Sequence, residues 1–428
     1  MDIPFLNFPS LYFIFGLSIP FVTLGIEVAP QWWLTPSLII GVILGGLTLL
    51  RGRFYYFAIF YFFFILYVIL NMWLTSSLSA QAFALAALVG SSVCIISVGY
   101  IEKFGFRSFY IGFDWSFRIV LGLVLLDLVL QVAGLKELSD FVSLGVTGDH
   151  NRWIPYNSVG PFTRPYGPFP EPSALGFYAF FSYIFFSQSE TKASSNRKNY
   201  AVLLTLLSMS MTGIMAVLIY RCLQLVSFNR FAVRYDGLLS RSRSRFIGVA
   251  GFFVLPIIFF FSDITVNLLV RFETVIAVLS NFSLMGSTGS RLLGGIYSIN
   301  VFFQEGFVDL MLGLGWGLQK VWLQDLFAFL DQGSPLSSGN LYDKASLIIL
   351  SLGLIGLFLW LAVIVLFFRA VNAERPIHVL FIILVWVFSS GHISGYLDWH
   401  LLLLIGVGYL SRSNCKSNAS LKGNPPEK

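Results

Sequence analysis

The sequence predicts an all-α fold, a polytopic membrane helix bundle of about 12 membrane helices with two large outer loops. Hydrophobic residues make up 57% of the 428 and charged residues only 11%, whereas soluble domains carry about 25% charged residues. Such a chain has too little polar surface to dissolve in water. Its apolar runs are long and continuous instead of alternating, which favours membrane helices over a membrane β-barrel.

The first 135 residues (1–135) are expected to form the N-terminal membrane helices. Apolar runs of membrane length fall near 10–28, 33–50, 54–74, 78–100 and 115–135. The N-terminus lacks the basic start of a cleaved signal peptide, so the first helix is expected to stay in the mature protein. Cys94, Cys222 and Cys415 form no CxxC pair and are predicted to be packing residues.

Two segments between the apolar runs, 136–171 and 263–344, are too long to be simple connectors. Long connections without a span of their own are usually functional or disordered. These two contain aromatics, glycines and apolar stretches such as ITVNLLVRFETVIAVLSNF (264–282). They are expected to be ordered outer loops that cap the bundle on its periplasmic side.

The central membrane helices are expected at 172–262, from apolar runs near 172–188, 200–228 and 246–262. The basic loops 188–199 and 221–245 both look cytoplasmic, although one ordinary span between them would put them on opposite sides. A short intramembrane hairpin at 200–228 resolves this conflict. It would turn at SMSMTG (208–213), where Ser, Thr and Gly can satisfy a bent backbone.

The C-terminal membrane helices are expected at 345–411, from runs near 345–368, 376–391 and 395–411, followed by a cytoplasmic tail at 412–428. Cytoplasmic loops collect Lys and Arg, and with the hairpin both termini are cytoplasmic. Seven of the 27 basic residues then fall on the outer side: Lys136, Arg152, Arg164, Arg271, Arg291, Lys320 and Lys344. The same rule accounts for RSRSR (241–245), so no nucleic-acid partner is expected.

The segment RPYGPFPEPSALG (164–176) keeps an arginine and a glutamate in a chain with few charges. The planar guanidinium of Arg164 can grip phosphate with two hydrogen bonds. Pro172 suits the first position of a helix, which places Glu171 near the N-cap, beside the positive end of the helix dipole. Glu171 would either stabilise that helix start or accept a proton from a sugar hydroxyl as a general base. The stretch alone leaves both roles open.

Other polar residues add candidates on or near the outer side. Arg291, in GSTGSRLLGGIYSINVF, is a second outer arginine, and two converging arginines would suit a lipid-linked phosphate or diphosphate. Asp127 lies inside an apolar span, where it is either functional or a helix-packing partner. His400, in YLDWH, is expected to pack rather than to act as a base. GLGWG (313–317) follows no predicted strand, so it predicts a tight turn instead of a nucleotide site.

Three motifs, in this order, resemble the superfamily of O-antigen polymerases and ligases, which are polytopic membrane glycosyltransferases. RPYGPFPEPSALG is similar to the R-x-x-G-x-F-x-E-P-S stretch at the start of a middle span. Arg291 followed by LGLGWG (312–317) is similar to the family's arginine-then-glycine-rich loop. NLYDKASLIILSLGLIGLF (340–358) is similar to its Asn-Leu-Tyr segment and Gly-Leu-Ile-Gly span. The resemblance covers roughly residues 160 to 370.

The resemblance implies a polymerase of O-antigen or exopolysaccharide, a multi-pass protein of the bacterial inner membrane with a periplasmic active face. It would transfer the growing glycan from undecaprenyl diphosphate to the next lipid-linked repeat unit. Arg164 and Arg291 would hold the diphosphates, and Glu171 would orient or deprotonate the acceptor. The further expected substrate contacts are His150, Arg152, Tyr166, Asn340 and Tyr342.

No metal or other cofactor is expected, because no acidic cluster on the outer face is dense enough to hold a metal. The implied partners are the undecaprenyl-diphosphate-linked oligosaccharide, membrane lipid and a chain-length regulator protein. Ligases typically carry a histidine directly before the Asn of the third motif, where this chain has Gly339, and this favours a polymerase. The hairpin turn often carries Ser-Arg in the family but reads SMSMTG here. A ligase that transfers finished glycan to lipid A core and a lipid-linked oligosaccharide transporter remain alternatives.

Overall fold

The computed structural model describes residues 9–21, 26–29, 32–51, 55–75, 85–86, 88–135, 138, 158–159, 162–163, 165, 167–169, 172–188, 192–232, 286–304, 306–316, 318–327, 344–371, 373, 376–387 and 396–422. Within these residues the chain is mainly helical, which confirms the predicted class. Two short antiparallel sheets of two strands each are the departures from it.

The elements follow one another along the chain as helices with two small strand pairs between them. They are α1 (Pro9–Ser18), β1 (Ile26–Ala29), β2 (Trp32–Leu34), α2 (Pro36–Leu50), α3 (Phe57–Thr75), the 3₁₀ helix η2 (Val93–Ser97), α5 (Val98–Tyr100), the π-helix η3 (Ile101–Gly105), α6 (Phe106–Val132), β3 (Ser158–Val159), β4 (Phe162–Thr163), α8 (Pro172–Gln188), α9 (Lys192–Leu207), α10 (Met211–Ala232), α13 (Gly286–Phe302), α14 (Phe307–Leu312), α15 (Gln319–Leu326), α16 (Lys344–Ala370), α17 (Pro376–Val387) and α18 (Tyr396–Lys422).

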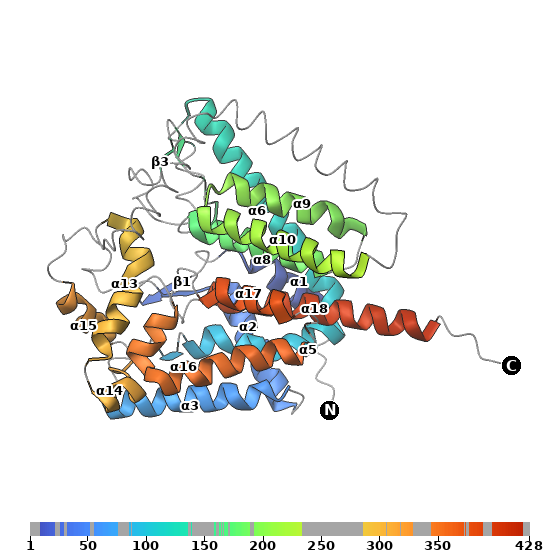
Figure 1. The fold of residues 1–428 in the computed structure, drawn as a ribbon. Helices are drawn as coiled ribbons and strands as arrows, with labels where there is room; N and C mark the ends of the chain where they lie inside the picture. The colour runs from blue at the N-terminus through green and yellow to red at the C-terminus, as the bar shows by residue number, and fades with distance from the viewer. Residues whose placement is uncertain are drawn as a thin grey trace.

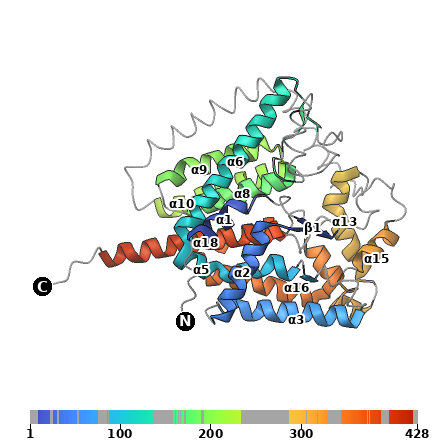
Figure 2. The same ribbon diagram turned by 180° about the vertical axis from the view of Figure 1, so that it is seen from behind.

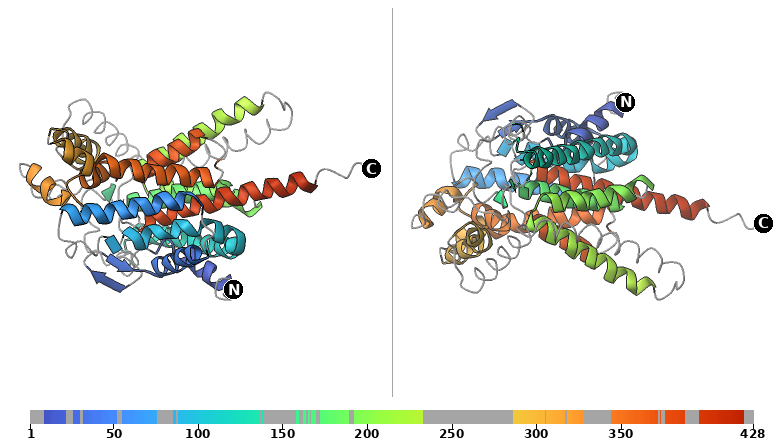
Figure 3. Two further views of the ribbon diagram at one scale, coloured as in Figure 1. Left: turned by 90° about the horizontal axis from the view of Figure 1, so that it is seen from below. Right: turned by 90° about the horizontal axis from the view of Figure 1, so that it is seen from above.

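The long helices run roughly side by side and form an elongated bundle (Figures 1 and 3). The short helices α13, α14 and α15 gather at one end of this bundle, on the same side as the two small sheets (Figure 1). We call this the cap end. Helix α18 extends past the opposite end (Figure 2). The described parts of both predicted outer loops therefore lie at one end of the molecule.

Among the described residues, three stretches are long and apolar enough to cross a membrane: Phe57–Thr75, Leu88–Val132 and Lys344–Ala370. Shorter apolar helices are Pro9–Ser18, Pro36–Leu50, Gly213–Gln224 and Pro376–Trp386. Large apolar side chains are exposed along α3 and α6, among them Phe63, Trp73 and Val129. Exposed apolar area of this kind marks a surface made for lipid or for another protein. The total of about 12 membrane helices stays a prediction.

The predicted first span is wrong in its extent. A helix was expected over 10–28, but α1 ends at Ser18 and residues 26–29 form a strand that pairs antiparallel with Trp32–Leu34. Pro20, two residues after the helix end, disfavours a helical conformation in the residue before it. The next helix starts later than expected, at Pro36, because the Thr35 side chain caps it by accepting from the Leu38 N–H at 3.2 Å.

The predicted spans 78–100 and 115–135 are joined by helical structure instead of a loop. Residues Leu88–Val132 form one apolar helical stretch, in which the expected cytoplasmic loop EKFGFR lies in η3 and the start of α6. Helix α6 leaves this point at an angle to the residues before it (Figure 1). A π-helical turn admits an extra residue into the helix, and such irregular turns are common sites of a bend.

The predicted reversal of the chain at SMSMTG is present. Helices α9 and α10 are joined by a turn at 208–210, where Met209 has a positive φ of 49°. The Ser208 hydroxyl donates to the Thr205 carbonyl at 2.7 Å and accepts from the Ser210 N–H at 3.2 Å. Serine side chains thus satisfy the bent backbone, as the sequence predicted. The depth of this turn in a membrane stays a prediction.

The turn packs against the start of α8. A Cβ added to Gly176 would lie 2.6 Å from the Ser210 Cβ, and one added to Gly213 would lie 2.9 Å from the Gly176 Cα. Small residues allow membrane helices to approach backbone to backbone. The same device holds α1 on α6, where a Cβ on Gly16 would lie 2.9 Å from the Phe113 nitrogen.

The prediction for the cysteines is right at one position and wrong at another. Cys94 is free and fully buried between α2 and the core, so it is a packing residue. Cys222, also free, is exposed on α10. The side chain of Cys415 lies outside the described residues.

Candidate functional site

The predicted site residues lie largely outside the part of the chain that the structure describes. Arg291 belongs to α13, but its side chain is outside the described set. The others outside it are His150, Arg152, Arg164, Tyr166, Glu171, Asn340 and Tyr342. Convergence of Arg164 and Arg291 therefore stays a prediction. For Arg164, Glu171 and Arg291, described residues close by in the chain show which elements lie next to them.

The chain around Arg164 is anchored on α6 and α8. Strand β4 ends at Thr163 and pairs with β3. Gly167 has a φ of +52°, and a Cβ there would lie 3.3 Å from Val124 of α6. Phe169 is fully buried, with its ring centroid 5.0 Å from that of Tyr178 on α8. Residues 167–169 of the proline-rich segment are thus held against two long helices.

Helix α8 begins at Pro172, as the sequence predicted. Proline lacks an N–H and has a φ near the helical value, so it fits the first position of a helix. The residue before it is Glu171. The helix start that would hold this carboxylate is therefore present, and its role as cap or base stays open.

Arg291 lies in the first third of α13, which packs on α16. The far half of α13 is bound to α15: the Phe302 ring lies 6.0 Å from Trp322, and the Tyr297 ring 5.8 Å from Phe327. Aromatic pairs at these separations contribute beyond their buried area. Helix α13 is therefore part of a packed cap that rests on α16.

The glycine-rich turn at 312–316 enters a break in α16. Gly353 interrupts this helix with φ 66° and ψ −168°. At the break, the Leu314 N–H donates to the Leu350 carbonyl at 2.7 Å, and the Gly315 N–H donates to the Ser351 carbonyl at 3.0 Å. The last carbonyls of a helix have no partner within it. The turn supplies those partners, so the second and third motifs of the resemblance meet here.

Glycine is required on both sides of this contact. Gly313 has a φ of +81°, and a Cβ there would lie 2.5 Å from the Gly353 nitrogen. A Cβ on Gly353 would overlap the Met311 carbonyl. The left-handed φ and the close backbone approach are each favourable only for glycine. The expected tight turn at GLGWG is confirmed for its described residues. The structure adds that this turn packs into the break in α16.

Two polar residues of α3 hold the turn and the break together. The Asn71 side chain donates to the Leu312 carbonyl at 2.7 Å and accepts from the Trp316 N–H at 3.2 Å. One helical turn earlier, the Tyr67 hydroxyl donates to the Leu352 carbonyl at 2.7 Å. Asn71 is 3% exposed. We call Tyr67 and Asn71 the α3 clamp.

Sequence reasoning missed the α3 clamp. The available signal was a single Asn in the span FAIFYFFFILYVILNMWLT, because a polar side chain in an apolar span needs a partner. No local pattern indicates which partner Asn71 binds, because Asn71 and Leu312 are 241 residues apart.

The start of α16, next to Asn340 and Tyr342 in sequence, is fixed by Lys344. This lysine is fully buried. Its Nζ donates to the Trp386 carbonyl at 3.1 Å and lies 5.4 Å from the centre of the Trp386 ring. Trp386 in turn stacks on Trp360 at 5.1 Å. The segment that carries the third motif is therefore tied to the end of α17.

The other polar candidates have packing partners. Asp127 is buried and accepts a hydrogen bond from Gln131 at 3.1 Å on the next turn of α6. His400 is fully buried, with Nε2 at 3.2 Å from the Ser37 carbonyl and its ring 5.4 Å from Phe15. The packing role expected for His400 agrees with this position.

Among the described residues, no three His, Cys, Asp or Glu side chains lie together as metal ligands would. The described part of the site consists of satisfied backbone groups and aromatic anchors. It forms a packed scaffold at the cap end, next in sequence to several of the motif residues. No protein-family model and no curated protein matches this chain.

Proposed function

We propose that the protein is a membrane glycosyltransferase that polymerises lipid-linked oligosaccharide repeat units into O-antigen or a related surface polysaccharide. The observation that carries this proposal is the contact between the turn at 312–316 and the break in α16. These two segments are parts of the second and third motifs of the resemblance. Motifs that belong to one active site are expected to meet in space, although they are separate in sequence.

The proposed reaction exchanges one glycosidic bond for another. The bond between the anomeric carbon of the growing glycan and the diphosphate oxygen breaks, and a hydroxyl of the next repeat unit forms the new bond. The hydroxyl proton goes to a base, for which Glu171 is the candidate. Undecaprenyl diphosphate leaves with its negative charge stabilised by Arg164 and Arg291. No metal or cofactor takes part in this scheme.

A transporter of lipid-linked oligosaccharide is the second candidate, and one observation favours it. Transporters often bind their substrates at discontinuous helices, and α16 is broken at Gly353. The break is filled here by a backbone turn, with the clamp residues closing it. A filled break is better suited to a fixed scaffold than to a moving gate, so the polymerase is preferred.

The deciding experiment is a glycan ladder on a gel from the host with the gene deleted. A polymerase predicts loss of the ladder, with a single repeat unit still attached to its acceptor. Loss of all attached glycan, with polymer accumulating on undecaprenyl diphosphate, would indicate the ligase. Repeat units that stay on the cytoplasmic side would indicate the transporter.

The two arginines are tested in the same assay. Arg164→Ala and Arg291→Ala are each expected to abolish long chains at normal protein abundance, because the leaving diphosphate loses its charge partner. The matched control is Lys320→Ala, which removes a cap-end charge outside the motifs and should leave the ladder intact. Wild-type chain length in both arginine variants would end the two-arginine scheme.

A further inference from the structure

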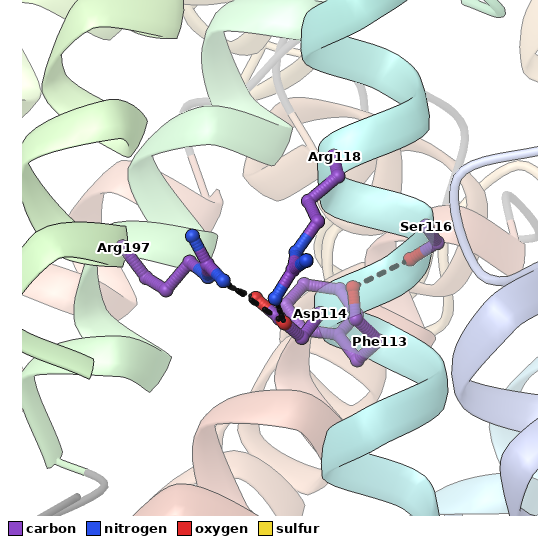
Figure 4. Close-up of polar contacts among 5 residues, drawn as sticks. All are labelled: Phe113, Asp114, Ser116, Arg118 and Arg197. Atoms are coloured by element: carbon purple, nitrogen blue, oxygen red, sulfur yellow. Dashed lines mark hydrogen bonds and ion pairs between the residues drawn. The ribbon is translucent and has the colours of Figure 1, made fainter. Parts of the chain in front are cut away.

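Two arginines and one aspartate meet between α6 and α9 (Figure 4). The Asp114 carboxylate accepts from Arg118 Nη2 at 2.6 Å, one turn further along α6, and from the Nε of Arg197 on α9. The Nη2 of Arg197 lies 3.4 Å from the same carboxylate. Two positive charges thus share one negative charge. We call these three residues the arginine cluster, and it keeps a net positive charge.

Arg118 interrupts an apolar face of α6. Its side chain is 47% exposed. The exposed apolar residues before and after it on this helix are Ile111, Trp115, Ile119, Leu125, Leu126, Val129 and Val132. Positions with these spacings share one face of a helix. Such a face suits lipid, where an arginine is unfavourable unless it meets an anion.

Both arginines stand where their helix passes from polar to apolar sequence. In α6, Arg118 is followed by eight uncharged residues, IVLGLVLL (119–126). In α9, the polar segment that contains Arg197 is followed by YAVLLTLL (200–207). The hydrogen bonds to Asp114 hold these two boundaries at one level. A boundary shared by neighbouring helices corresponds to the headgroup region of a bilayer.

Two exposed aromatic rings flank the arginine cluster. The Cζ of Arg118 lies 5.3 Å from the centre of the Trp115 ring, and the Cζ of Arg197 lies 5.9 Å from the centre of the Tyr200 ring. Trp and Tyr are typical of the membrane–water interface. In the part of the chain that the structure describes, Arg118 donates hydrogen bonds only through Nη2. Its Nε and Nη1 groups can therefore donate to a ligand.

We propose that Arg118 and Arg197 form a binding site for the phosphate of an anionic membrane lipid. The two guanidinium groups supply the charge and the N–H donors that phosphate oxygens need. The apolar face of α6 beyond Arg118 would contact the acyl chains. The orientation inferred from the basic loops puts the site in the cytoplasmic leaflet, whose anionic lipids attract basic clusters. The site does not depend on the proposed polymerase activity.

The test is native mass spectrometry of the full-length protein in detergent with added phosphatidylglycerol, and with phosphatidylcholine as the neutral lipid. Arg118→Gln is expected to bind phosphatidylglycerol about fivefold more weakly than the wild type. The matched control is Arg107→Gln, which removes the same charge from an exposed residue of the same helix. Arg107 lies about 16 Å from Arg118 along the helix axis, so binding by the control should match the wild type.

Asp114→Asn separates lipid binding from a purely structural role. Asparagine keeps one oxygen that can accept from the arginines but removes the negative charge that competes with a phosphate. We therefore expect Asp114→Asn to bind phosphatidylglycerol more tightly than the wild type. If the arginine cluster only joins α6 to α9, this variant should weaken lipid binding or leave it unchanged.

Several results would overturn the proposal. They are equal binding by Arg118→Gln and the wild type, an equal loss in Arg118→Gln and Arg107→Gln, and equal retention of phosphatidylcholine and phosphatidylglycerol. Full displacement of the lipid by millimolar inorganic phosphate would assign the site to a soluble anion instead. A melting temperature for each variant shows that it is folded, and binding by a folded Asp114→Asn that is no tighter than the wild type would also count against the site.

Discussion

At the scale of single residues, Asn71 combines two roles that few side chains can fill. Its amide donates to one backbone carbonyl and accepts from one backbone N–H, at the two ends of the same turn. A carboxylate offers no donor, and an aliphatic side chain offers neither group. An asparagine in an apolar span is costly unless both of its groups are paired, and here both are.

We expect Asn71→Leu to destabilise the protein by about 1–3 kcal/mol. It removes the partner of the buried Trp316 N–H and leaves the Leu312 carbonyl with only the longer contact from the Tyr67 hydroxyl at 3.4 Å. The measurement is equilibrium unfolding in mixed detergent. The control changes Leu66, an exposed apolar side chain of the same helix. Leu66→Ala is the suitable control and should cost less. Equal stability of Asn71→Leu and the wild type would show that the α3 clamp is not required.

At the scale of elements, the break in α16 is stabilised by contacts from outside the helix. Three successive carbonyls, those of Leu350, Ser351 and Leu352, receive donors from the turn at 312–316 and from Tyr67. A helix end buried without partners would be unfavourable. The break and the turn therefore form one structural unit, in which neither part is satisfied alone.

Gly353→Ala is expected to disrupt this unit. The φ of 66° and ψ of −168° at Gly353 lie in a region essentially confined to glycine, which costs other residues about 1–3 kcal/mol, and the Cβ of alanine would overlap the Met311 carbonyl. We expect lower thermal stability and, if the polymerase proposal holds, shorter glycan chains. Gly46→Ala is the matched control, because a Cβ there meets nothing within 4 Å and alanine favours a helix. A stable, active Gly353→Ala would contradict this account of the break.

At the scale of the whole molecule, the described parts of the two long outer segments share one end of the bundle (Figure 1). The basic side chains Arg197, Lys198 and Arg412 lie on helices that extend toward the other end. Lys and Arg gather on the cytoplasmic side of membrane proteins. The shape of the molecule is thus compatible with the orientation inferred from charge.

Labelling of single cysteines tests this orientation. In a variant without Cys94, Cys222 and Cys415, we expect Gln304→Cys at the cap end to react with a membrane-impermeant maleimide in intact cells. Lys103→Cys, in η3, should react only after the membrane is permeabilised. Both positions are exposed in the structure. The side of the membrane on which each lies, and not burial within the protein, therefore decides whether it reacts. The reverse labelling pattern would invert the topology and remove the cap from the periplasm.

Local signals in the sequence were sufficient for several features. The helical class follows from the length and continuity of the apolar runs, because lipid offers backbone groups no hydrogen bonds. The start of α8 at Pro172 and the turn at Ser208–Ser210 are each set by residues within a few positions of them. Such features depend on local backbone preference, so they can be read without knowledge of the rest of the fold.

Other features were decided only by the tertiary structure. The sequence predicted a tight turn at GLGWG (313–317) and placed Gly353 in an apolar span. It did not show that the turn and the span contact each other or that Asn71 holds them together. Each of these groups is satisfied by a partner far away in the chain, 241 residues in the case of Asn71 and Leu312. A hydrogen bond between distant segments has no local sequence signal, because its energy appears only when packing brings the two segments together.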